Sequence, residues 1–284
     1  MAPTADLPSN GTATLSPYAV NTQPFAGKVI TVTGASRGTG LALCKYLLAR
    51  GATVSMCATS AENLAKASAE IDAEFPEAKG RYWTSVVDIS KLETVQSWIK
   101  QTVEKFGPLD GCANVAAQEQ REIYPITMLD ATYFSNLLNV NVTGTFHCLQ
   151  EEMKVIKDGG AIVNVGSITS NYASAGVAAY VAAKHALIGL TKVAAFEGAP
   201  RGIRVNALCP GCINTEMMAK PFNSPAGEFH LTASNIPMIL KRDLAEPWEI
   251  AASIAFLLGD ESKYVTKAAW YVDGGWVEGS YSSG

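Results

Sequence analysis

The chain has 284 residues, of which 48% are hydrophobic and 17% are charged, and its formal net charge is −4. This length suits one or two domains with a sizeable core, and the acidic balance argues against a nucleic-acid partner, which would need clustered Lys and Arg. Six cysteines are too few for a disulfide scaffold, and no signal peptide or membrane span is visible, so we expect a cytoplasmic protein with no membrane partner.

Residues 1–26 are rich in Pro, Ser, Thr, Ala and Asn, which predicts a flexible N-terminal arm. From residue 27 to 284, strand-like and helix-like runs alternate, and the pattern predicts a single domain. Strands are predicted at 28–33, 53–57, 82–87, 110–115, 161–165, 203–208 and 268–272. Helices are predicted at 38–50, 62–75, 92–106, 128–156, 178–197 and 248–258.

Repeated β-α-β units need right-handed crossovers and give a parallel sheet that helices cover on both faces. We therefore predict an α/β fold, namely a doubly wound, Rossmann-like, seven-stranded parallel sheet. The alternation stops between residues 215 and 243, where prolines and scattered apolar residues occur. An irregular insert of this length is more often a functional lid than an accident.

A glycine-rich loop, Thr-Gly-Ala-Ser-Arg-Gly-Thr-Gly, follows the first predicted strand at residues 33–40. Gly34, Gly38 and Gly40 permit a sharp turn, and the helix that begins there offers free N–H groups to a phosphate. Because the loop lies in the first β-α-β unit, it predicts a dinucleotide site that includes Ser36 and Thr39.

The end of the second strand distinguishes the two nicotinamide cofactors. An NAD site carries an acid there, but this chain reads Ala-Thr-Ser at 58–60. Arg37 in the glycine loop and the hydroxyls of Thr59 and Ser60 can meet a 2′-phosphate, which favours NADP(H). The alternative for Arg37 is a solvated surface charge.

Tyr180 and Lys184 are four residues apart on a predicted helix and so share one face. Ser167 lies upstream at the end of a predicted strand, where ligands bind in open parallel sheets. With the glycine loop, Asp88, Asn114, Asn141 and Pro210-Gly211, these residues occur in an order that resembles the short-chain dehydrogenases/reductases, over about residues 28–276.

The resemblance implies that Tyr180 protonates a carbonyl oxygen as hydride arrives, while Ser167 orients that carbonyl. Lys184 would hold the nicotinamide ribose, and Asn141 would bind a water that connects Lys184 to solvent. A cation at ~4 Å can also lower the pKa of a phenol by roughly three units, so we expect Lys184 to lower that of Tyr180.

The resemblance also implies cofactor contacts from residues that follow the strands. Asp88 would accept the adenine amino group with Ile89 beside it, Asn114 and Ala116 would lie along the ribose, and Pro210, Gly211, Ile213 and Thr215 would face the nicotinamide. The chain departs from the family's Asn-Asn-Ala-Gly at 114–117, where it has Asn-Val-Ala-Ala. Gly166 replaces a frequent Ser, and it either frees room for a bulky substrate or has no such effect.

Tyr172, Met217, Met218 and Phe222 are candidates to line an apolar substrate pocket, and ordinary packing is the alternative. Gln118, Glu119 and Arg121 follow the fourth predicted strand, where members of the family that this chain resembles vary with substrate. Cys209 and Cys212 form a C-x-x-C pattern, but no second pair or clustered His accompanies it, so we expect neither redox chemistry nor a metal site.

We therefore expect an oxidoreductase that uses NADPH to reduce a bulky, largely apolar ketone to a secondary alcohol, reversibly with NADP⁺. The chain is similar to fungal secondary-metabolism reductases, and the helices at 128–156 and 178–197 would join the subunits of a homotetramer. Two alternatives remain open: a non-redox isomerase, lyase or cyclase on the same scaffold, and a non-catalytic NADP(H)-binding protein.

Overall fold

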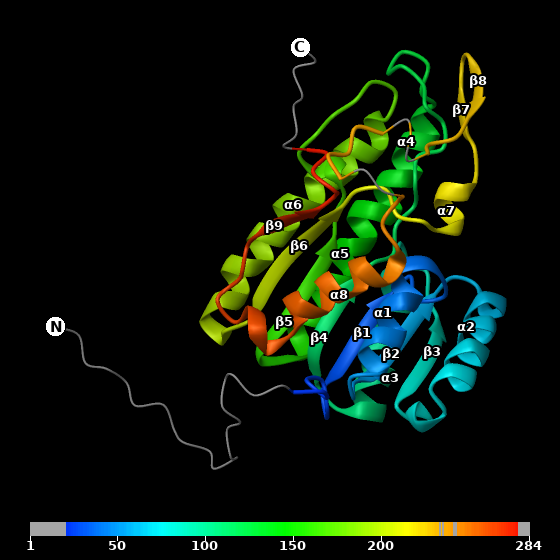
Figure 1. Ribbon diagram of the computed structural model, residues 1–284. Helices are drawn as coiled ribbons and strands as arrows, with labels where there is room; N and C mark the ends of the chain where they lie inside the picture. The colour runs from blue at the N-terminus through cyan, green and yellow to red at the C-terminus, as the bar shows by residue number, and fades with distance from the viewer. Residues whose placement is uncertain (1–20, 233, 235, 241–242, 278–284) are drawn as a thin grey trace.

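Seven parallel strands form one sheet in the order β3-β2-β1-β4-β5-β6-β9 (Figure 1). The structure is a computed structural model and describes residues 21–232, 234, 236–240 and 243–277. The strands are β1 (Val29–Thr33), β2 (Thr53–Ala58), β3 (Tyr82–Val86), β4 (Leu109–Asn114), β5 (Ile156–Val165), β6 (Arg204–Pro210) and β9 (Ala269–Val272). The predicted Rossmann-like fold is confirmed, with strand ends shifted by a few residues.

Helices cover both faces of the sheet (Figure 1). One face carries α1 (Gly38–Leu48), α2 (Ala61–Glu74) and α8 (Pro247–Leu258), and the other carries α3 (Leu92–Phe106), α5 (Gly144–Val155) and α6 (Ala178–Gly198). The strands are buried on both sides, which explains their nearly continuous apolar sequences.

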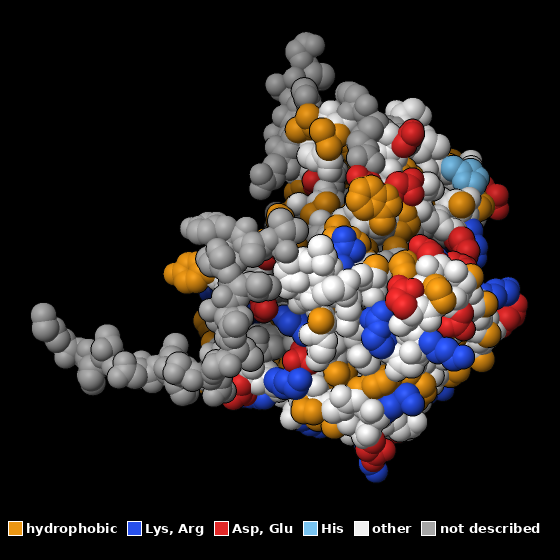
Figure 2. Space-filling model, turned by 60° about the horizontal axis from the view of Figure 1, so that its bottom comes forward, with side chains coloured by type: hydrophobic (Ala, Val, Ile, Leu, Met, Phe, Trp, Pro, Cys, Tyr) orange, Lys and Arg blue, Asp and Glu red, His pale blue; other side chains and the backbone are white. Residues whose placement is uncertain are grey.

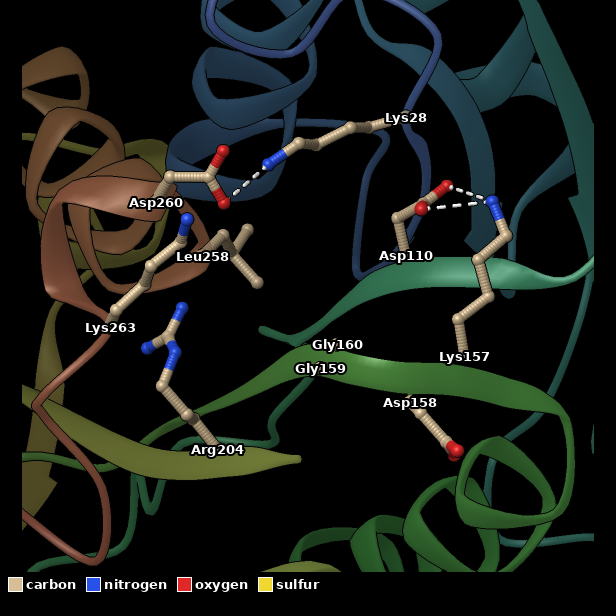
Figure 3. A pocket seen from close by; sticks show the side chains of 10 residues that line it. All are labelled: Lys28, Asp110, Lys157, Asp158, Gly159, Gly160, Arg204, Leu258, Asp260 and Lys263. Atoms are coloured by element: carbon tan, nitrogen blue, oxygen red, sulfur yellow. Dashed lines mark hydrogen bonds and ion pairs between the residues drawn. The ribbon is translucent and has the colours of Figure 1, made fainter. Parts of the chain in front are cut away.

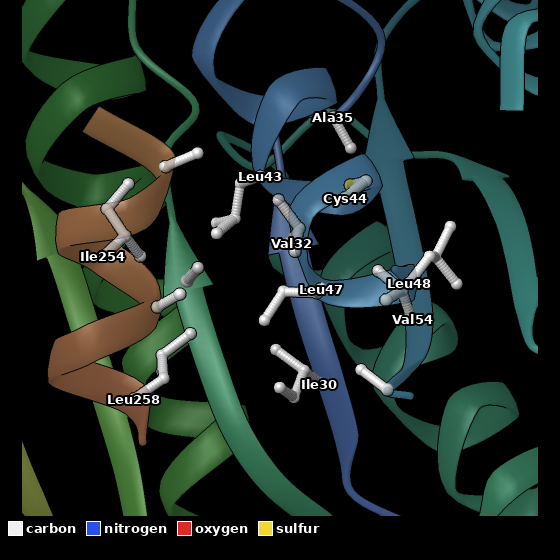
Figure 4. Close-up of a cluster of buried hydrophobic side chains, with 14 of the residues drawn as sticks. Ile30, Val32, Ala35, Leu43, Cys44, Leu47, Leu48, Val54, Ile254 and Leu258 are labelled. Atoms are coloured by element: carbon white, nitrogen blue, oxygen red, sulfur yellow. The ribbon is translucent and has the colours of Figure 1, made fainter. Parts of the chain in front are cut away.

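The largest apolar cluster lies where α1 and α8 meet above β1 (Figure 4). Leu43 and Leu47 of α1 lie on one face of the helix because they are four residues apart, as do Ile254 and Leu258 of α8. All four are at most 5% exposed and pack in the cluster that contains Ile30. Burying each side chain of this kind contributes about 1.5–3 kcal/mol to the free energy of unfolding. The cluster therefore stabilises the contact between α1, near the start of the chain, and α8, near its end.

The long helix predicted at 128–156 is interrupted. The chain forms α4 (Ala131–Leu138), a π-helical turn η2 (Asn139–Thr143) and then α5. A π turn inserts one extra residue, and such turns occur mostly at functional sites. The prediction of one continuous helix was wrong because the turn depends on a tertiary contact of Asn141, described below.

The irregular stretch at 215–243 contains local structure that the sequence did not predict. Its described part forms the short helix α7 (Glu216–Ala219) and an antiparallel hairpin of β7 (Phe222–Ser224) and β8 (Gly227–Phe229). The strands of this hairpin have three residues each, too few for a clear alternating pattern. In Figure 1 the hairpin stands at the same end of the molecule as α4.

The predicted N-terminal arm lies mostly outside the described residues, since positions 1–20 are not described. Its last residues pack on the domain instead of extending from it. Phe25 is 3% exposed within the α1–α8 cluster, and its backbone N–H donates to the carbonyl of Arg50 at 3.1 Å. Positions 21–26 therefore belong with the domain.

Basic and acidic side chains are interspersed on the face shown in Figure 2. Within the described ranges, no helix combines the length and hydrophobicity that a bilayer crossing would need.

A buried polar cluster lies within the sheet and one helix layer. The Glu152 carboxylate of α5 accepts hydrogen bonds from Asn114 Nδ2 at 2.9 Å and Thr31 Oγ1 at 3.4 Å. Asn114 also donates to Asn164 Oδ1 at 3.0 Å, and Asn164 donates to Thr191 Oγ1 at 2.9 Å. The cluster thus joins β1, β4 and β5 to two helices.

Burial raises the pKa of Glu152 to about 7 despite the hydrogen bonds from Asn114 and Thr31. The folded protein therefore binds a proton that the unfolded chain releases at a lower pH. The free energy of unfolding therefore falls as the pH rises from about 4.5 toward 7. Above that range Glu152 causes no further loss of stability.

Glu152→Gln should remove this pH dependence, since a neutral amide occupies the site at every pH. Between pH 5 and 7.5, we expect the free energy of unfolding to fall by about 1–3 kcal/mol more in the wild type than in this variant. Urea denaturation across that range measures both curves. Glu151→Gln is the matched control, because burial is outweighed there by Lys154 and Gln96 and the pKa of Glu151 is lowered. Parallel curves for Glu152→Gln and wild type would contradict the assignment.

Candidate active site

The glycine loop packs tightly against two other loops at the carboxyl edge of the sheet. A Cβ on Gly40 would collide with the carbonyl oxygen of Gly34, and a Cβ on Gly34 would lie 2.9 Å from Ala116 Cα. Gly34 and Gly38 also have positive φ angles, and a Cβ on Gly38 would lie 3.2 Å from Thr215 Cγ2. Loops that follow β1, β4 and β6 therefore meet here.

The start of α1 fits the diphosphate of a dinucleotide. Its N-cap residue, Arg37, makes no side-chain capping hydrogen bond, and the first turn carries no acidic residue. The helix therefore presents its N–H groups and the positive end of its dipole without a protein anion to satisfy them. Ser36 and Thr39 lie in the same loop, half-buried and buried respectively.

The predicted 2′-phosphate ligands are accessible. Arg37 has a 48% exposed side chain, and its Nη1 lies 3.5 Å from the Glu216 carboxylate of α7. An exposed pair of this kind contributes about 0–1 kcal/mol, so a phosphate can compete for the guanidinium. Thr59 is exposed, and Ser60 caps α2 by accepting from Asn63 N at 3.2 Å.

Two of the predicted adenine contacts have local structural roles. Asp88 Oδ1 accepts from the Ser90 hydroxyl at 2.7 Å and from its N–H at 3.1 Å. Ile89 is 6% exposed and lies so close to Gly144 that a Cβ there would be 2.7 Å from Ile89 Cγ1. Asp88 keeps its second carboxylate oxygen for other partners, 3.8 Å from Lys91 Nζ.

The Asn114 side chain does not lie where a ribose would bind, which corrects that expectation. It is 4% exposed and points into the Glu152 cluster, with its Oδ1 buried and unpaired. Only the backbone of Asn114 remains for a cofactor. The next two residues are positioned by Thr33, whose Oγ1 accepts from the N–H groups of Val115 and Ala116, both at 3.0 Å.

Ser167, Tyr180 and Lys184 come together as predicted from their order. Ser167 is close enough to the Tyr180 phenol to lower its pKa, and Lys184 Nζ lies 5.5 Å from the centre of the Tyr180 ring. Ser167 follows β5 and begins the 3₁₀ turn η3 (Ile168–Ser170), while the other two lie on α6. Lys184 is 2% exposed and donates to the Val165 carbonyl at 2.7 Å.

The expected lowering of the pKa of Tyr180 by Lys184 is not found. Burial raises the pKa of Tyr180 above its ordinary range, and the nearby Glu119 carboxylate raises it further. Burial also lowers the pKa of Lys184 to about 8, which weakens the cation itself. Burial and the negative charge of Glu119 therefore keep the Tyr180 phenol protonated near neutral pH.

Asn141 lies in the π turn and is 2% exposed. Its side chain forms hydrogen bonds with the loop that follows β4. Its Oδ1 accepts from Gln118 N and its Nδ2 donates to Gln118 O, both at 2.7 Å. An amide has one further donor and one further acceptor position, so Gln118 uses half of its capacity. The side chain thus positions the 118–121 loop.

Gln120 is a site residue that the sequence reasoning missed. It is 2% exposed, and its Oε1 accepts from the backbone N–H of Tyr180 at 3.0 Å. Its Nε2 donates to the carbonyls of Glu122 and Gly176 at 2.7 and 2.9 Å. Gln120 thereby fixes the start of α6, and no sequence spacing could have revealed this contact between residues 60 apart.

The C-x-x-C pattern spans the end of β6, with Cys209 in the strand and Cys212 in the loop that follows it. Gly211 lies close to the end of β9, since a Cβ on it would be 3.0 Å from Asp273 Cα, and Ile213 packs against the core. Burial raises the pKa of the Cys209 thiol, and raises that of Cys212 to about 11. Neither thiol is ionised near neutrality, and no described group of His, Cys, Asp and Glu could hold a metal.

The space beside Gly166 is filled by protein atoms. A Cβ there would lie 2.8 Å from both Cys209 Sγ and Ser170 Oγ. The alternative in which Gly166 frees room for substrate is therefore wrong. A larger residue at this position would have to displace the side chain of Cys209 or Ser170.

Arg121 fastens the irregular insert to the loop that follows β4. Its guanidinium donates to the carbonyls of Lys220 at 2.7 Å and Met217, and stacks over the Phe222 ring at 4.7 Å. Its own carbonyl accepts from Asn223 N at 3.0 Å. One side chain thus holds both α7 and β7.

The predicted substrate residues differ in availability. Phe222 is 4% exposed and stacks on Phe229 at 5.6 Å, so it packs the hairpin. Met217 and Met218 are half-buried, and Tyr172 is exposed. Glu119 is mostly buried beside Arg121, with 2.5 Å between its Oε2 and Arg121 Nη2.

A separate polar cavity of about 250 Å³ lies at the opposite edge of the sheet (Figure 3). Residues at the starts of strands line it, including Lys28 before β1 and Arg204 at the start of β6. Its charges are largely paired, with Lys157 Nζ 2.8 Å from Asp110. It lies away from the site, since the site residues follow the carboxyl ends of the strands.

Known proteins resemble this chain over most of its length. The family described as enoyl-(acyl carrier protein) reductase matches residues 34–277. The short-chain dehydrogenase/reductase aba4 of Botryotinia fuckeliana (strain B05.10) is 40% identical over 260 residues, 90% of this chain and 99% of that protein. Levodione reductase of Leifsonia aquatica is 32% identical over 268 residues, 93% of this chain and 98% of that protein.

Two further comparisons concern a substrate and a cofactor. The 2,5-dichloro-2,5-cyclohexadiene-1,4-diol dehydrogenase of Sphingobium indicum (strain DSM 16412) is 35% identical over 256 residues, 89% of this chain and 98% of that protein. A solved blue fluorescent protein from a metagenomic library, in complex with NADPH, has a TM-score of 0.78 and 32% identity. The match covers 89% of this chain and 99% of that one.

Arg121→Met should loosen the insert, because a thioether cannot donate to the carbonyls of Met217 and Lys220. We expect amide hydrogen exchange in residues 217–224 to rise by about tenfold or more. Arg201→Met is the matched control, since Arg201 also donates to backbone carbonyls, including Met153 O at 2.9 Å, but on another part of the molecule. Unchanged exchange in Arg121→Met would show that the hairpin is held by other contacts.

Proposed function

Because the chain belongs to the short-chain dehydrogenase/reductase family, we propose that it reduces a ketone to a secondary alcohol with NADPH, reversibly with NADP⁺. The observation that carries the proposal is the meeting of Ser167, Tyr180 and Lys184 at the same sheet edge as the glycine loop, with Lys184 Nζ 5.5 Å from the centre of the Tyr180 ring. When bound, NADPH supplies the hydride that adds to the carbonyl carbon.

Tyr180 donates its phenolic proton to the carbonyl oxygen, which completes the alcohol. Its raised pKa supports this direction, since the phenol keeps its proton near neutrality. The Ser167 hydroxyl orients the carbonyl, and Lys184 restores the proton and holds the nicotinamide ribose. Asn141 holds a water beside Lys184 with the donor and acceptor that Gln118 leaves free.

The proposed cofactor contacts follow the loops at the carboxyl edge. Arg37, Thr59 and Ser60 receive the 2′-phosphate, and the start of α1 receives the diphosphate. Asp88 binds adenine through its free carboxylate oxygen. The remaining contacts come from Gly34, Ser36, Gly38, Thr39, Gly40, Ile89, Ala116, the backbone of Asn114, and Pro210, Gly211, Ile213 and Thr215.

We propose a largely apolar ring ketone as substrate, closed over by residues 215–243 acting as a lid. Two relatives support a substrate with two oxygen atoms, since one is named for a dione and one for a cyclohexadiene-1,4-diol, and the second name also supports a ring. Met217 and Met218 are half-buried on the insert, which suits an apolar ligand.

We also propose a homotetramer located in the cytoplasm. Large apolar side chains stand exposed on the helices expected to join subunits, with Phe146 on α5 and Val193 and Phe196 on α6 each at least 45% exposed. Contiguous exposed apolar groups of this kind mark interaction surfaces. The six cysteines are all free thiols, which suits a reducing compartment.

Tyr180→Phe should abolish proton donation while leaving the fold and cofactor contacts in place. We expect kcat/KM for NADPH-dependent reduction of cyclic ketones to fall by roughly 10²–10⁴-fold, with NADPH affinity little changed. Loss of NADPH absorbance measures the rate. The control is Tyr264→Phe, which removes a hydroxyl from a fully exposed side chain. Product formation by the wild type without NADPH consumption would favour the non-redox alternative.

Arg37→Ala should weaken NADPH binding by about tenfold or more and leave NADH binding nearly unchanged, because a charge-assisted contact to the 2′-phosphate is lost. Nicotinamide fluorescence titration measures both affinities. Arg50→Ala, at the far end of α1, is the matched control. Equal wild-type affinities for the two cofactors would overturn the NADP(H) preference, and binding of neither would favour a role without redox chemistry.

A further inference from the structure

The Glu119 carboxylate is held at the reacting end of the site by residues on either side of it. Gln118 is gripped by Asn141, and Gln120 binds the backbone of Tyr180, so the backbone between them is fixed. The side chain is 16% exposed. Because Gln120 binds the first turn of α6, Glu119 lies near that helix, and its charge raises the pKa of both the Tyr180 phenol and the Cys212 thiol.

Among the residues that the structure describes, Arg121 forms the one ion pair with Glu119, and it does not satisfy the whole carboxylate. Its Nη2 lies 2.5 Å from Oε2, but this buried oxygen accepts no hydrogen bond of good geometry, and no described group donates to Oε1. Burial nevertheless raises the pKa of Glu119 to about 7, against the opposing effect of Arg121. A further donor would therefore stabilise the carboxylate.

The nature of this donor follows from the charges around it. Glu119 and Arg121 together carry no net charge, so a cationic ligand gains little. Arg121 already donates to the carbonyls of Met217 and Lys220 and stacks on Phe222, so it has little capacity for an anionic ligand. A neutral hydroxyl group is the remaining donor of suitable size and chemistry.

We propose that Glu119 determines specificity by accepting a hydrogen bond from a substrate hydroxyl other than the oxygen being reduced. The preferred substrate is then a hydroxylated ring ketone, and its product is a ring diol. This inference rests on the proposed reduction for its substrate class, but the hydroxyl site itself can be tested by binding alone.

Dead-end binding separates the hydroxyl site from the reaction, because an alcohol and NADPH cannot react together. The probes are trans-1,4-cyclohexanediol and 4-methylcyclohexanol, added to the full-length protein with NADPH and followed by nicotinamide fluorescence. We expect the wild type to bind the diol about tenfold or more tightly than the methyl analogue, as a hydrogen bond to a charged group provides. Glu119→Gln should reduce this ratio to within about threefold.

Glu122→Gln is the matched control. Glu122 lies on the same loop, but it accepts from Asn223 Nδ2 at 3.0 Å and lines a separate cavity of about 280 Å³. This variant should keep the wild-type preference for the diol.

The pH dependence gives a second measurement that needs no variant. The diol preference of the wild type should be several-fold larger at pH 8 than at pH 6, since the charged carboxylate is the better acceptor. Of the groups near Glu119, Tyr180 and Cys212 have raised pKa values and stay protonated over this range. Lys184, beside Tyr180, also titrates near pH 8, but it is present in Glu119→Gln, where the preference should not change with pH.

Equal wild-type affinities for the two alcohols, binding of neither, or a preference that survives in Glu119→Gln would overturn the inference. Selective diol binding without reduction of 4-hydroxycyclohexanone by NADPH would instead leave the hydroxyl site standing and contradict the proposed reaction.

Discussion

All seven strands of the sheet run in one direction, and this constraint decides where every site residue lies. Parallel strands joined by right-handed crossovers bring their carboxyl ends to one edge. The glycine loop after β1, the loop after β4, Ser167 after β5 and the loop after β6 therefore meet, although they are spread over more than half of the chain. These loops pack so closely that a Cβ on Gly34 or Gly38 would press against Ala116 or Thr215.

Two buried carboxylates have opposite relations to this edge. Glu152 of α5 is fully buried against the sheet. It accepts hydrogen bonds from Thr31 of β1 and Asn114 of β4 and so connects these two strands to the helix. Glu119 lies at the edge itself, beside Tyr180 and with one charged partner, Arg121. Burial raises the pKa of each to about 7, yet only Glu119 is placed where a ligand can supply what the protein does not.

The loop from Gln118 to Arg121 connects the π turn, the start of α6 and the irregular insert. Asn141 in the π turn grips its first residue, Gln120 holds the start of α6, and Arg121 holds the insert. A shift of the insert would therefore reach Tyr180 through only a few residues. This continuity gives a direct structural connection between the insert and Tyr180.

The sequence by itself determined the succession of strands and helices along the chain and the parallel sheet with helices on both faces. It also determined the glycine loop and the order of Ser167, Tyr180 and Lys184. These features are local: apolar periodicity, glycines at a turn and residues one helical turn apart are visible within short segments. Tertiary structure alone decided the π turn at Asn141, the inward direction of Asn114, the packing of Cys209 into the space at Gly166 and the partners of Gln120, Glu119 and Arg121. It also reversed the expected shift in the pKa of Tyr180. Each of these depends on burial or on a hydrogen bond between residues distant in the chain, and neither leaves a periodic trace in the sequence.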